Sequence, residues 1–494
     1  MKKKYKTVVL FLFITLLHIK NMVFCLQTDE QYFMVLSQRL ANGVQIFKEC
    51  YDIHQTSAVF TSLLLRLKYW LVNTESYDML YLKSIGLLVQ IALTYYTYKK
   101  LRKVYTDRAV IASLLFYAFT PKLSVMPDYA LMQYHLLCLI IVTIVVDKEC
   151  RFLLGVLCGL LCIVYPPFTP VALLAVLVNR KKVITNALIC IFTMSTYFLI
   201  FIRGNIEYVS NMLGNSMHNG NIIEVFSMYL KDDLLQIGLC ITVLILMIVR
   251  NKYSYMIASI SLIGFQAFFV LIKQIPYAFN VVLILPYLLL FTYKKNRSLL
   301  LAGLTIPVMQ LLVGNQGGFI CLRYLVPIIV IGVCLIEDKK LLQYTLSSLI
   351  IFLLPMLVVT STFYSKPTEL IRVIDGSLSG CFVDISLADK IESLKDLDSY
   401  FDSGDVLIMD SDSALYTYTK LNCNSPTVIN TPVFNDKFVE YYDVSTWPNY
   451  IIKFMNSGLI DFDDTFEKYV SSSYTVRKYK DALIFEGGES NYEN

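Results

Sequence analysis

Residues 129–146 read YALMQYHLLCLIIVTIVV and contain no Lys, Arg, Asp or Glu. An apolar run of this length is typical of a helix that crosses the hydrocarbon core of a bilayer, which takes roughly 17–25 residues. Further runs of membrane length recur along the chain. They fall near 7–25, 78–98, 108–126, 184–202, 233–249, 254–272, 277–293, 298–314, 318–336 and 341–362.

The composition agrees with a polytopic membrane protein. Of 494 residues, 56% are hydrophobic and 16% are charged, which excludes an ordinary soluble globular chain. One further apolar stretch, 151–180, is broken at Tyr165-Pro166-Pro167 into two arms of about a dozen residues, each short for a span. We expect two short helices that meet at the outer face. The predicted fold class is an α-helical polytopic membrane protein with about 13 transmembrane helices.

The basic residues indicate an orientation. Residues 1–362 hold 32 Lys and Arg against 16 Asp and Glu, whereas residues 363–494 hold 11 against 22. Cytoplasmic loops of membrane proteins carry an excess of Lys and Arg. An N-terminus inside the cell places most of the Lys and Arg residues of 1–362 in cytoplasmic loops. Thirteen crossings then place residues 363–494 outside, which fits their acidic character. The sequence therefore predicts a multi-pass protein of the plasma membrane.

The first apolar segment has two interpretations. Its uninterrupted core, Thr7–Leu17, is short and follows a basic start, a combination that a cleaved signal peptide also shows. We favour an uncleaved helix. Cleavage would leave the topology of the rest of the chain unchanged.

Two regions are predicted outside the membrane. The first outer loop, 27–77, has apolar residues at helical spacing in two segments, which we expect to lie on the membrane surface as interfacial helices. Their members are Tyr32, Val35, Leu36, Leu40, Val44 and Phe47 in one, and Phe60, Leu63, Leu64, Leu67 and Trp70 in the other. The segment 204–232 has a similar character. The sequence thus predicts a transmembrane domain, 1–362, and an outer domain, 363–494.

The outer domain is expected to be a small α/β domain. Strand-like runs begin at Asp405, Thr427 and Ala482, and helical patterns cover 388–400 and 449–456. Most of the twelve cysteines lie in apolar segments, where cysteine behaves as a small hydrophobe. Outside them, Cys381 with Cys423 and Cys25 with Cys50 are candidate disulfides, and free thiols are the alternative.

Ionisable residues gather at the outer boundary of the predicted membrane domain. The stretch LQTDEQYFMVLSQRLANG, 26–43, places Asp29 and Glu30 directly after the first apolar segment. Such a pair can cap a helix, but adjacent acids also perturb each other's pKa, which suits a general base. Arg323 lies within an apolar run, where an ionised side chain costs about 2.5–3.5 kcal/mol on insertion scales and so indicates function. Snorkelling to the interface is the alternative for Arg323 and for Lys122.

Several motifs occur in a fixed order along the chain. TDEQYF, ANG, FKECYD and HQTSAVF follow one another in the first outer loop, Asp128 opens a later apolar run, and RYLVP begins at Arg323. In this order they resemble the membrane-embedded glycosyltransferases of the GT-C fold. The resemblance is to the polyprenyl-phosphate-sugar branch, which includes protein O-mannosyltransferases and aminoarabinose transferases of lipid A. The chain departs from that pattern at His54-Gln55, where the family has prolines.

The resemblance implies an activity and its residues. It implies transfer of a sugar, with inversion, from a polyprenyl-phosphate donor to a glycan, lipid or protein acceptor outside the cytoplasm, with no nucleic-acid partner. Asp29 would be the base, supported by Glu30. Arg323, Lys122 and Tyr324 would bind the donor phosphate, and Asp128, His54 and Gln55 would bind substrate. The chemistry itself needs a base for the acceptor proton and a cation for the departing phosphate.

Other polar residues have plainer interpretations. His54 with Glu49 or Asp52 is a candidate ligand set for a divalent metal, although a histidine beside acids more often forms hydrogen bonds, and no cofactor is predicted. Lys83 and Lys273 are expected to be ordinary basic residues near outer helix ends. His135 is expected to be a buried group with a hydrogen-bond partner, and His218 to be solvated.

Two other function classes fit a chain of this kind. A polysaccharide polymerase or ligase would share an outer site and lipid-phosphate chemistry. A lipid-linked glycan flippase or solute transporter would show internal repeats and ionisable residues at mid-membrane depth. The sequence has no evident repeat and gathers its polar residues at the boundary, so we favour the transferase.

Overall fold

The computed structural model describes most of the first 211 residues and much of the region after residue 370. The described residues are 2–24, 26–121, 124–146, 152–178, 182–211, 303–313, 323–336, 370–401, 403–428, 441–442, 447–455 and 470–487, with a few positions between 253 and 346. The chain forms two compact units. Unit 1 comprises Met1–Asn21, Ile85–Ile200 and Met217–Thr360, and unit 2 comprises Met22–Ser84, Phe201–Ser216 and Ser361–Asn494.

Four helices in the described part of the chain are long and apolar enough to cross a membrane. They are Tyr5–Phe24 within α1 (Lys2–Phe24), α4 (Asp78–Arg102), α6 (Tyr129–Val146) and α9 (Val183–Phe201). In lipid every backbone N–H and C=O needs a partner within the protein, and a helix supplies these partners within one segment. The four corresponding spans expected from the sequence coincide with these helices.

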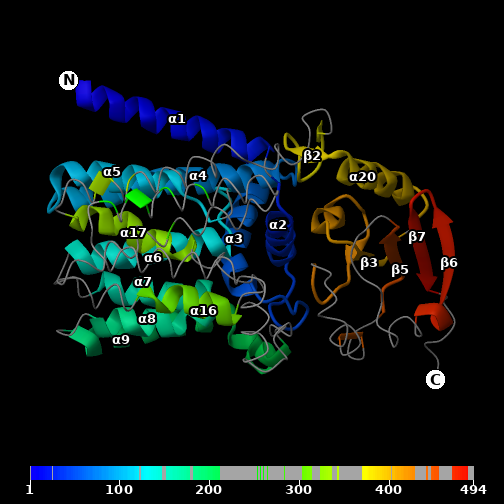
Figure 1. The fold of residues 1–494 in the computed structure, drawn as a ribbon. Coiled ribbons are helices and arrows are strands. Elements are labelled where there is room, and N and C mark those ends of the chain that lie inside the picture. The colour runs from blue at the N-terminus through cyan, green and yellow to red at the C-terminus, as the bar shows by residue number, and fades with distance from the viewer. Residues whose placement is uncertain are drawn as a thin grey trace. The chain divides into compact units, whose positions relative to one another are not determined.

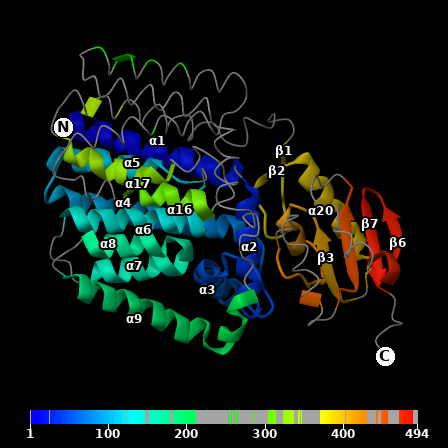
Figure 2. The same cartoon turned by 60° about the horizontal axis from the view of Figure 1, so that its bottom comes forward.

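The stretch with the Tyr-Pro-Pro break forms two short helices, as expected. α7 (Leu153–Val164) and α8 (Thr169–Val178) are joined by the single turn η1 (Pro166–Phe168). Tyr165 has a non-helical backbone, because a residue before proline is sterically disfavoured in the helical region. α6, α7 and α8 pack side by side (Figure 1; Figure 2).

The expected span 108–126 extends too far. α5 (Thr106–Ala118) ends at Ala118, and residues 119–121 and 124–128 are not helical. Thr120 precedes Pro121, which disfavours a helical backbone at Thr120 and removes an N–H donor. Gly86 of α4 allows this segment to approach closely, because a Cβ at that position would meet the Val125 carbonyl oxygen.

Side chains of other helices bind the carbonyl groups at the end of α5. Gln90 Nε2 donates to the Phe116 oxygen at 2.9 Å, and His18 Nε2 lies 2.7 Å from the Tyr117 oxygen. His135 is buried and hydrogen-bonds Gln90, which confirms the expectation for this histidine. The last carbonyl groups of a helix have no partner within that helix. Among apolar helices these polar side chains supply the hydrogen bonds that water would supply elsewhere.

Much of the remaining membrane region lies outside the described residues. This holds for nearly all of the expected spans 233–249, 254–272, 277–293 and 341–362, and for Lys122, His218 and Lys273, whereas the expected spans 298–314 and 318–336 are described at 303–313 and 323–336. Within it the structure describes α16 (Thr305–Val313), α17 (Val326–Gly332) and the following turn η7 (Val333–Leu335). α17 packs against α5 and α6. The outer segment 204–232 is described only in η3 (Arg203–Asn211).

A five-stranded sheet forms the core of the tail. Its strands are β3 (Asp405–Met409), β4 (Asn422–Cys423), β5 (Tyr450–Phe454), β6 (Tyr474–Tyr479) and β7 (Ala482–Gly487). The order is β4-β3-β5-β7-β6, with β3 parallel to β4 and β5, and β7 antiparallel to β5 and β6. The hairpin of β1 (Leu370–Arg372) and β2 (Phe382–Asp384) and the helix α20 (Ile385–Asp398) precede the sheet (Figure 1).

The tail corrects two details of the sequence prediction. The helix expected over 449–456 is the strand β5, because Ile451 and Ile452 are fully buried and the strand pairs with both β3 and β7. Pairing on both edges outweighs a local helical pattern. Thr427 and Val428 follow β4 and are not in a strand, and the rest of that expected run lies outside the described residues. The helix expected over 388–400 is present as α20.

The structure also corrects the prediction for the first helix of the first outer loop. α2 (Thr28–Ala41) was expected on the membrane surface, but all its residues from Glu30 to Leu40 are buried. It packs against α3 (Gln55–Val72) and against the turn η9 (Ser413–Thr417) of the tail. The apolar residues of α2 therefore face protein, and the loop and the tail together build unit 2.

Candidate functional site

The adjacent acids lie in the first turn of α2. Gln27 is the N-cap, and its backbone N–H donates to Glu30 Oε2 at 3.0 Å, while Glu30 N–H donates to the Gln27 carbonyl at 3.0 Å. These reciprocal bonds between Gln27 and Glu30 explain why a helix begins here. Negative charge in the first turn also interacts favourably with the helix dipole.

Glu30 has a second and stronger partner. Lys83 Nζ of α4 lies 3.1 Å from Glu30 Oε2, and both side chains are fully buried. Burying either charge alone would cost several kcal/mol, so each neutralises the other. Glu30 is thus held by the Gln27 N–H and by Lys83, and its role is to position the start of α2.

Asp29 is placed differently from its neighbour. It is only half-buried, whereas Glu30 is inaccessible to solvent. Successive residues on a helix point in directions about 100° apart, so adjacent acids serve different surroundings. Of the two carboxylates, Asp29 is the one that a ligand can reach.

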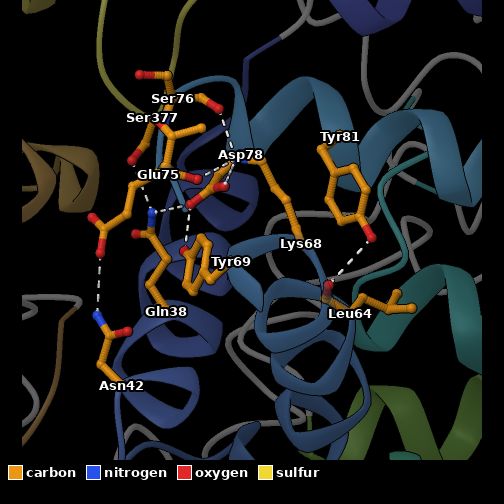
Figure 3. A network of polar contacts seen from close by, with 11 residues as sticks. Gln38, Asn42, Leu64, Lys68, Tyr69, Glu75, Ser76, Asp78, Tyr81 and Ser377 are labelled. Atoms are coloured by element: carbon orange, nitrogen blue, oxygen red, sulfur yellow. Dashed lines mark hydrogen bonds and ion pairs between the residues drawn. The ribbon is translucent and has the colours of Figure 1, made fainter. Parts of the chain in front are cut away.

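The start of α4 carries a buried polar network (Figure 3). Asp78 is fully buried; it forms an ion pair with Lys68 of α3 and accepts hydrogen bonds from Tyr69 at 2.5 Å and from Gln38 of α2 at 2.7 Å. Gln38 Nε2 also donates to Ser377 Oγ of the tail at 2.8 Å. Residues of α2, α3 and α4 therefore meet at one carboxylate, and Gln38 connects them to the tail.

The ammonium group of Lys68 has three hydrogen-bond acceptors in the same network. Besides Asp78, its ammonium group donates to the Thr74 carbonyl at 3.0 Å and to the Ser76 carbonyl at 2.6 Å. Three acceptors match the three N–H bonds of an ammonium group. The Lys68 ammonium group thereby ties the end of α3 to the loop 74–76 and to the start of α4.

Gln55 and His54 lie at the start of α3. Gln55 is buried, donates to the Cys50 carbonyl at 3.1 Å and accepts from the Phe47 N–H at 2.8 Å. It thereby holds the 46–50 turn, where Phe47 has a positive φ of 65°. His54 is the half-buried N-cap residue, and its ring lies edge-on to Tyr32 at 6.2 Å. Gln55 thus has a structural role in this structure.

A third buried acid, Asp52, links the loop to the tail. It accepts hydrogen bonds from Cys50 Sγ at 3.0 Å and from Thr427 Oγ1. Burial raises the pKa of Asp52, although hydrogen bonds from Cys50 and Thr427 and the charge of Arg39 oppose that shift. The backbone N–H of Tyr51 donates to the tail at Pro426, 2.7 Å away.

The cysteines and the candidate metal ligands of this region form neither a disulfide nor a metal site among the described residues. Cys50, Cys381 and Cys423 are free cysteines, so the expected alternative of a Cys381–Cys423 disulfide is not formed, and Cys25 lies outside the described residues. Glu49 accepts the Gln45 N–H at 2.8 Å. Among the residues that the structure describes, no group of three or more His, Cys, Asp or Glu is arranged to hold a metal.

The remaining candidates belong to unit 1. Asp128 is buried and caps α6, where its Oδ1 accepts the Leu131 N–H at 2.8 Å. Arg323 donates from Nη1 to the Pro121 carbonyl at 3.2 Å, and its guanidinium lies 5.3 Å from the ring centre of Tyr324. Tyr324 is buried. These contacts fix Asp128 as a helix cap and give Arg323 an aromatic neighbour.

The ring of Tyr324 belongs to an aromatic group at the helix breaks of unit 1. Phe168 lies edge-on to Tyr324 at 6.4 Å and to Tyr165 at 5.0 Å, and Tyr165 stacks on Tyr129 at 6.0 Å. The starts of α6 and α17 and the break between α7 and α8 are thereby brought together.

The environment of Lys83 differs from the expectation for it. It is not an ordinary basic residue at a helix end, because it is fully buried and paired. A signal was present, since an ionisable residue inside an apolar helix indicates a specific partner. Its partner Glu30 is remote in sequence, and only the fold identifies it.

Comparison with known proteins adds no relative. No family model matches the chain, and no curated protein matches it.

Proposed function

We propose that the protein is a membrane glycosyltransferase that moves a sugar from a polyprenyl-phosphate-linked donor to an acceptor outside the cytoplasm. The acceptor would be a glycan, lipid or protein of the cell envelope. The observation that carries this proposal is the division of labour between two adjacent acids: Glu30 is paired with buried Lys83, and Asp29 remains half-buried on a rigid helix start.

In the proposed reaction Asp29 is the general base. It takes the proton from the acceptor hydroxyl or amine as that group attacks the anomeric carbon. The bond between this carbon and the phosphate oxygen breaks, and polyprenyl phosphate leaves with the electron pair. Attack from the side opposite the phosphate inverts the anomeric configuration. Fixing a base on a rigid element is worth several kcal/mol of activation free energy, because no reorganisation is needed during the reaction.

Arg323 is proposed to bind the donor phosphate, with Tyr324 beside it and Lys122 as a second cation. A guanidinium group offers a planar pair of donors that matches a phosphate. Asp128 and His54 are proposed substrate contacts, and the bond from Asp128 to α6 means that it would act from a fixed position.

Two buried polar side chains in the described part of unit 1 have structural partners and so give no support to the transporter alternative. A transporter needs ionisable or polar groups that line a path through the membrane. Gln90 and His18 instead bind backbone oxygens at the end of α5. A polymerase or ligase would use the same donor chemistry, and the acceptor separates it from the proposed activity.

The test is product formation with the purified chain in liposomes. A panel of polyprenyl-phosphate sugars is supplied with cell-envelope extract as acceptor, and release of polyprenyl phosphate is measured with and without extract. We expect acceptor-dependent release for one donor. Movement of an intact sugar lipid across the bilayer, without release, would identify a flippase and refute the transferase.

A further inference from the structure

Helix α6 carries a buried amide whose polar atoms lack hydrogen bonds. Gln133 is fully buried, and among the described residues neither its Oε1 nor its Nε2 has a hydrogen-bond partner. α6 is long and apolar enough to cross a membrane, where no bulk water can supply the missing bonds. A buried amide without hydrogen bonds is unfavourable, so its presence in this helix needs a physical reason.

Gln90 of α4 shows how a structural amide is satisfied in the same unit. Its Nε2 donates to the Phe116 oxygen at 2.9 Å, and its Oε1 hydrogen-bonds the ring of His135. Both ends of that amide therefore bind protein. Gln133 has the same side chain and the same burial but neither kind of contact, so packing against the described residues does not account for it.

Gln133 lies one turn beyond the aromatic group at the helix breaks. It follows Tyr129 by four residues and so shares a face of α6 with it, and helical side chains lean toward the N-terminus, here toward Tyr129. Tyr129 stacks on Tyr165 at 6.0 Å. Phe168 connects Tyr165 to Tyr324 through edge-on contacts. The unsatisfied amide thus lies beside a row of aromatic rings.

The two ends of this aromatic group are partly accessible. Tyr129 is half-buried at one end, and Arg323 is half-buried beside Tyr324 at the other, whereas the rings between them are buried. The guanidinium group of Arg323, proposed above to bind the donor phosphate, lies 5.3 Å from the ring centre of Tyr324. The aromatic group therefore connects the proposed phosphate-binding residue to Gln133.

The two ends of the amide select the chemical class of a ligand. Nε2 donates hydrogen bonds and Oε1 accepts them. A phosphate only accepts and an acyl chain does neither, so neither of them satisfies both ends. A hydroxyl group both donates and accepts, and a sugar carries several hydroxyl groups as well as C–H surfaces that pack against aromatic rings.

We propose that Gln133 determines donor specificity by hydrogen-bonding hydroxyl groups of the donor sugar, which packs against the aromatic group. The ligand then satisfies the amide that the protein leaves without hydrogen bonds. A sugar without a hydroxyl group at the right position leaves the amide unsatisfied and binds more weakly. This inference rests on the proposed transferase activity and adds a contact to its donor site.

The first test needs no substrate. Gln133→Met keeps the length of the side chain and removes both polar atoms, so the melting temperature of the protein in a detergent without sugar groups should rise. Gln90→Met removes a satisfied amide and should lower it. A melting temperature that Gln133→Met lowers as much as Gln90→Met does would mean that protein or water satisfies the amide, and would overturn the proposal.

The second test measures binding through the rise in melting temperature that a ligand causes. The probes are farnesyl phosphate, which has no sugar, and a panel of farnesyl phosphates that carry different hexoses and pentoses. The unaltered chain should bind at least one sugar-bearing probe about tenfold more tightly than farnesyl phosphate. Gln133→Met should lose this preference and bind both probes equally.

The matched control is Asn186→Leu. Asn186 of α9 is also fully buried, and its amide likewise has no hydrogen-bond partner in the described part of the chain, but it is outside the aromatic group. Asn186→Leu should raise the melting temperature and keep the sugar preference, whereas Arg323→Ala should weaken the binding of all probes.

The outcomes separate this inference from the proposed function. A sugar preference that survives in Gln133→Met would overturn the role of Gln133 and leave the proposed donor class intact. A chain that binds every sugar-bearing probe no more tightly than farnesyl phosphate, before any substitution, would overturn both.

Discussion

At the residue scale, two neighbouring carboxylates have been given different surroundings by the fold. Glu30 lies at the third position of α2, so its side chain turns back to the N-cap and meets Lys83 in a fully buried site. Asp29, one position earlier, remains half-buried. Adjacent acids in a sequence therefore need not share a function.

The Glu30–Lys83 pair makes a prediction about stability. Glu30→Gln leaves Lys83 buried without a counter-charge, and we expect a loss of about 3–5 kcal/mol in the free energy of unfolding. The double variant Glu30→Gln with Lys83→Met removes both charges and should recover most of this loss. Thermal unfolding in detergent measures both. A single variant as stable as the unaltered chain would show that the pair is not formed.

At the element scale, α2, α3, α4 and the tail are joined by buried polar contacts. Asp78 binds Lys68, Tyr69 and Gln38, and Asp52 binds Thr427. These contacts fix direction as well as adding stability, because a helix that rotates or slides leaves several polar groups unsatisfied.

The Asp78 network can be tested against a close neighbour. Asp78→Asn should destabilise unit 2 by about 3–5 kcal/mol, since Lys68 loses its counter-ion in a buried site. The control is Glu75→Gln, whose exposed carboxylate accepts only a 3.4 Å hydrogen bond from Asn42 in Figure 3 and should matter by less than about 0.5 kcal/mol. Equal effects of the two variants on thermal unfolding would contradict the network's role.

The raised pKa of Asp52 predicts that the stability of the protein depends on pH. Its pKa is raised by burial, so the folded state binds the proton more tightly than the unfolded chain, whose aspartates titrate near about 3.9. Its favourable contribution is present below that pH and is lost as the pH rises through the raised pKa. The melting temperature of Asp52→Asn relative to the unaltered chain should therefore increase with pH over this range.

Burial sets this sign, and the groups that face Asp52 oppose it. Cys50 and Thr427 donate to it and Arg39 is nearby, and all three act against the effect of burial. Asp389→Asn, which alters an exposed acid of α20, serves as the control. A relative melting temperature that falls as the pH rises would mean that Arg39 outweighs burial.

At the scale of the whole molecule, local features were predicted well and distant pairings were not. The span at 129–146 and the break at Tyr165-Pro166-Pro167 follow from composition and from proline stereochemistry, which act within a few residues. The burial of α2 depends on a turn at 413–417, and β5 depends on its neighbours β3 and β7. No local pattern contains that information.

The candidate site shows the same contrast between local features and distant pairings. Asp29, Glu30 and Arg323 were found from their type and place in the sequence. The function of Glu30 as a cap and ion-pair partner, and of Gln55 as a support for the 46–50 turn, follows only from their partners.

The predicted orientation of the chain is open to direct measurement. Val104 is exposed after α4, and Ser386 is exposed on α20. A membrane-impermeant maleimide should label Ser386→Cys in intact cells beyond the level of the unaltered chain, and should label Val104→Cys only after the cells are opened, because the basic loops are predicted to be cytoplasmic. Labelling of Val104→Cys alone in intact cells would reverse the topology.

The central claim is that Asp29 is the general base of a sugar transfer, and Asp29→Asn tests it most directly. The substitution keeps the shape of the side chain and removes its basicity, so the rate of acceptor-dependent polyprenyl-phosphate release should fall by about 10²–10⁴-fold. Donor binding, the amount of folded protein in the membrane and the activity of the Asp389→Asn control should be unchanged. If Asp29→Asn instead lowers the amount of folded protein while activity per folded molecule holds, Asp29 only stabilises the helix start, and the catalytic assignment is wrong.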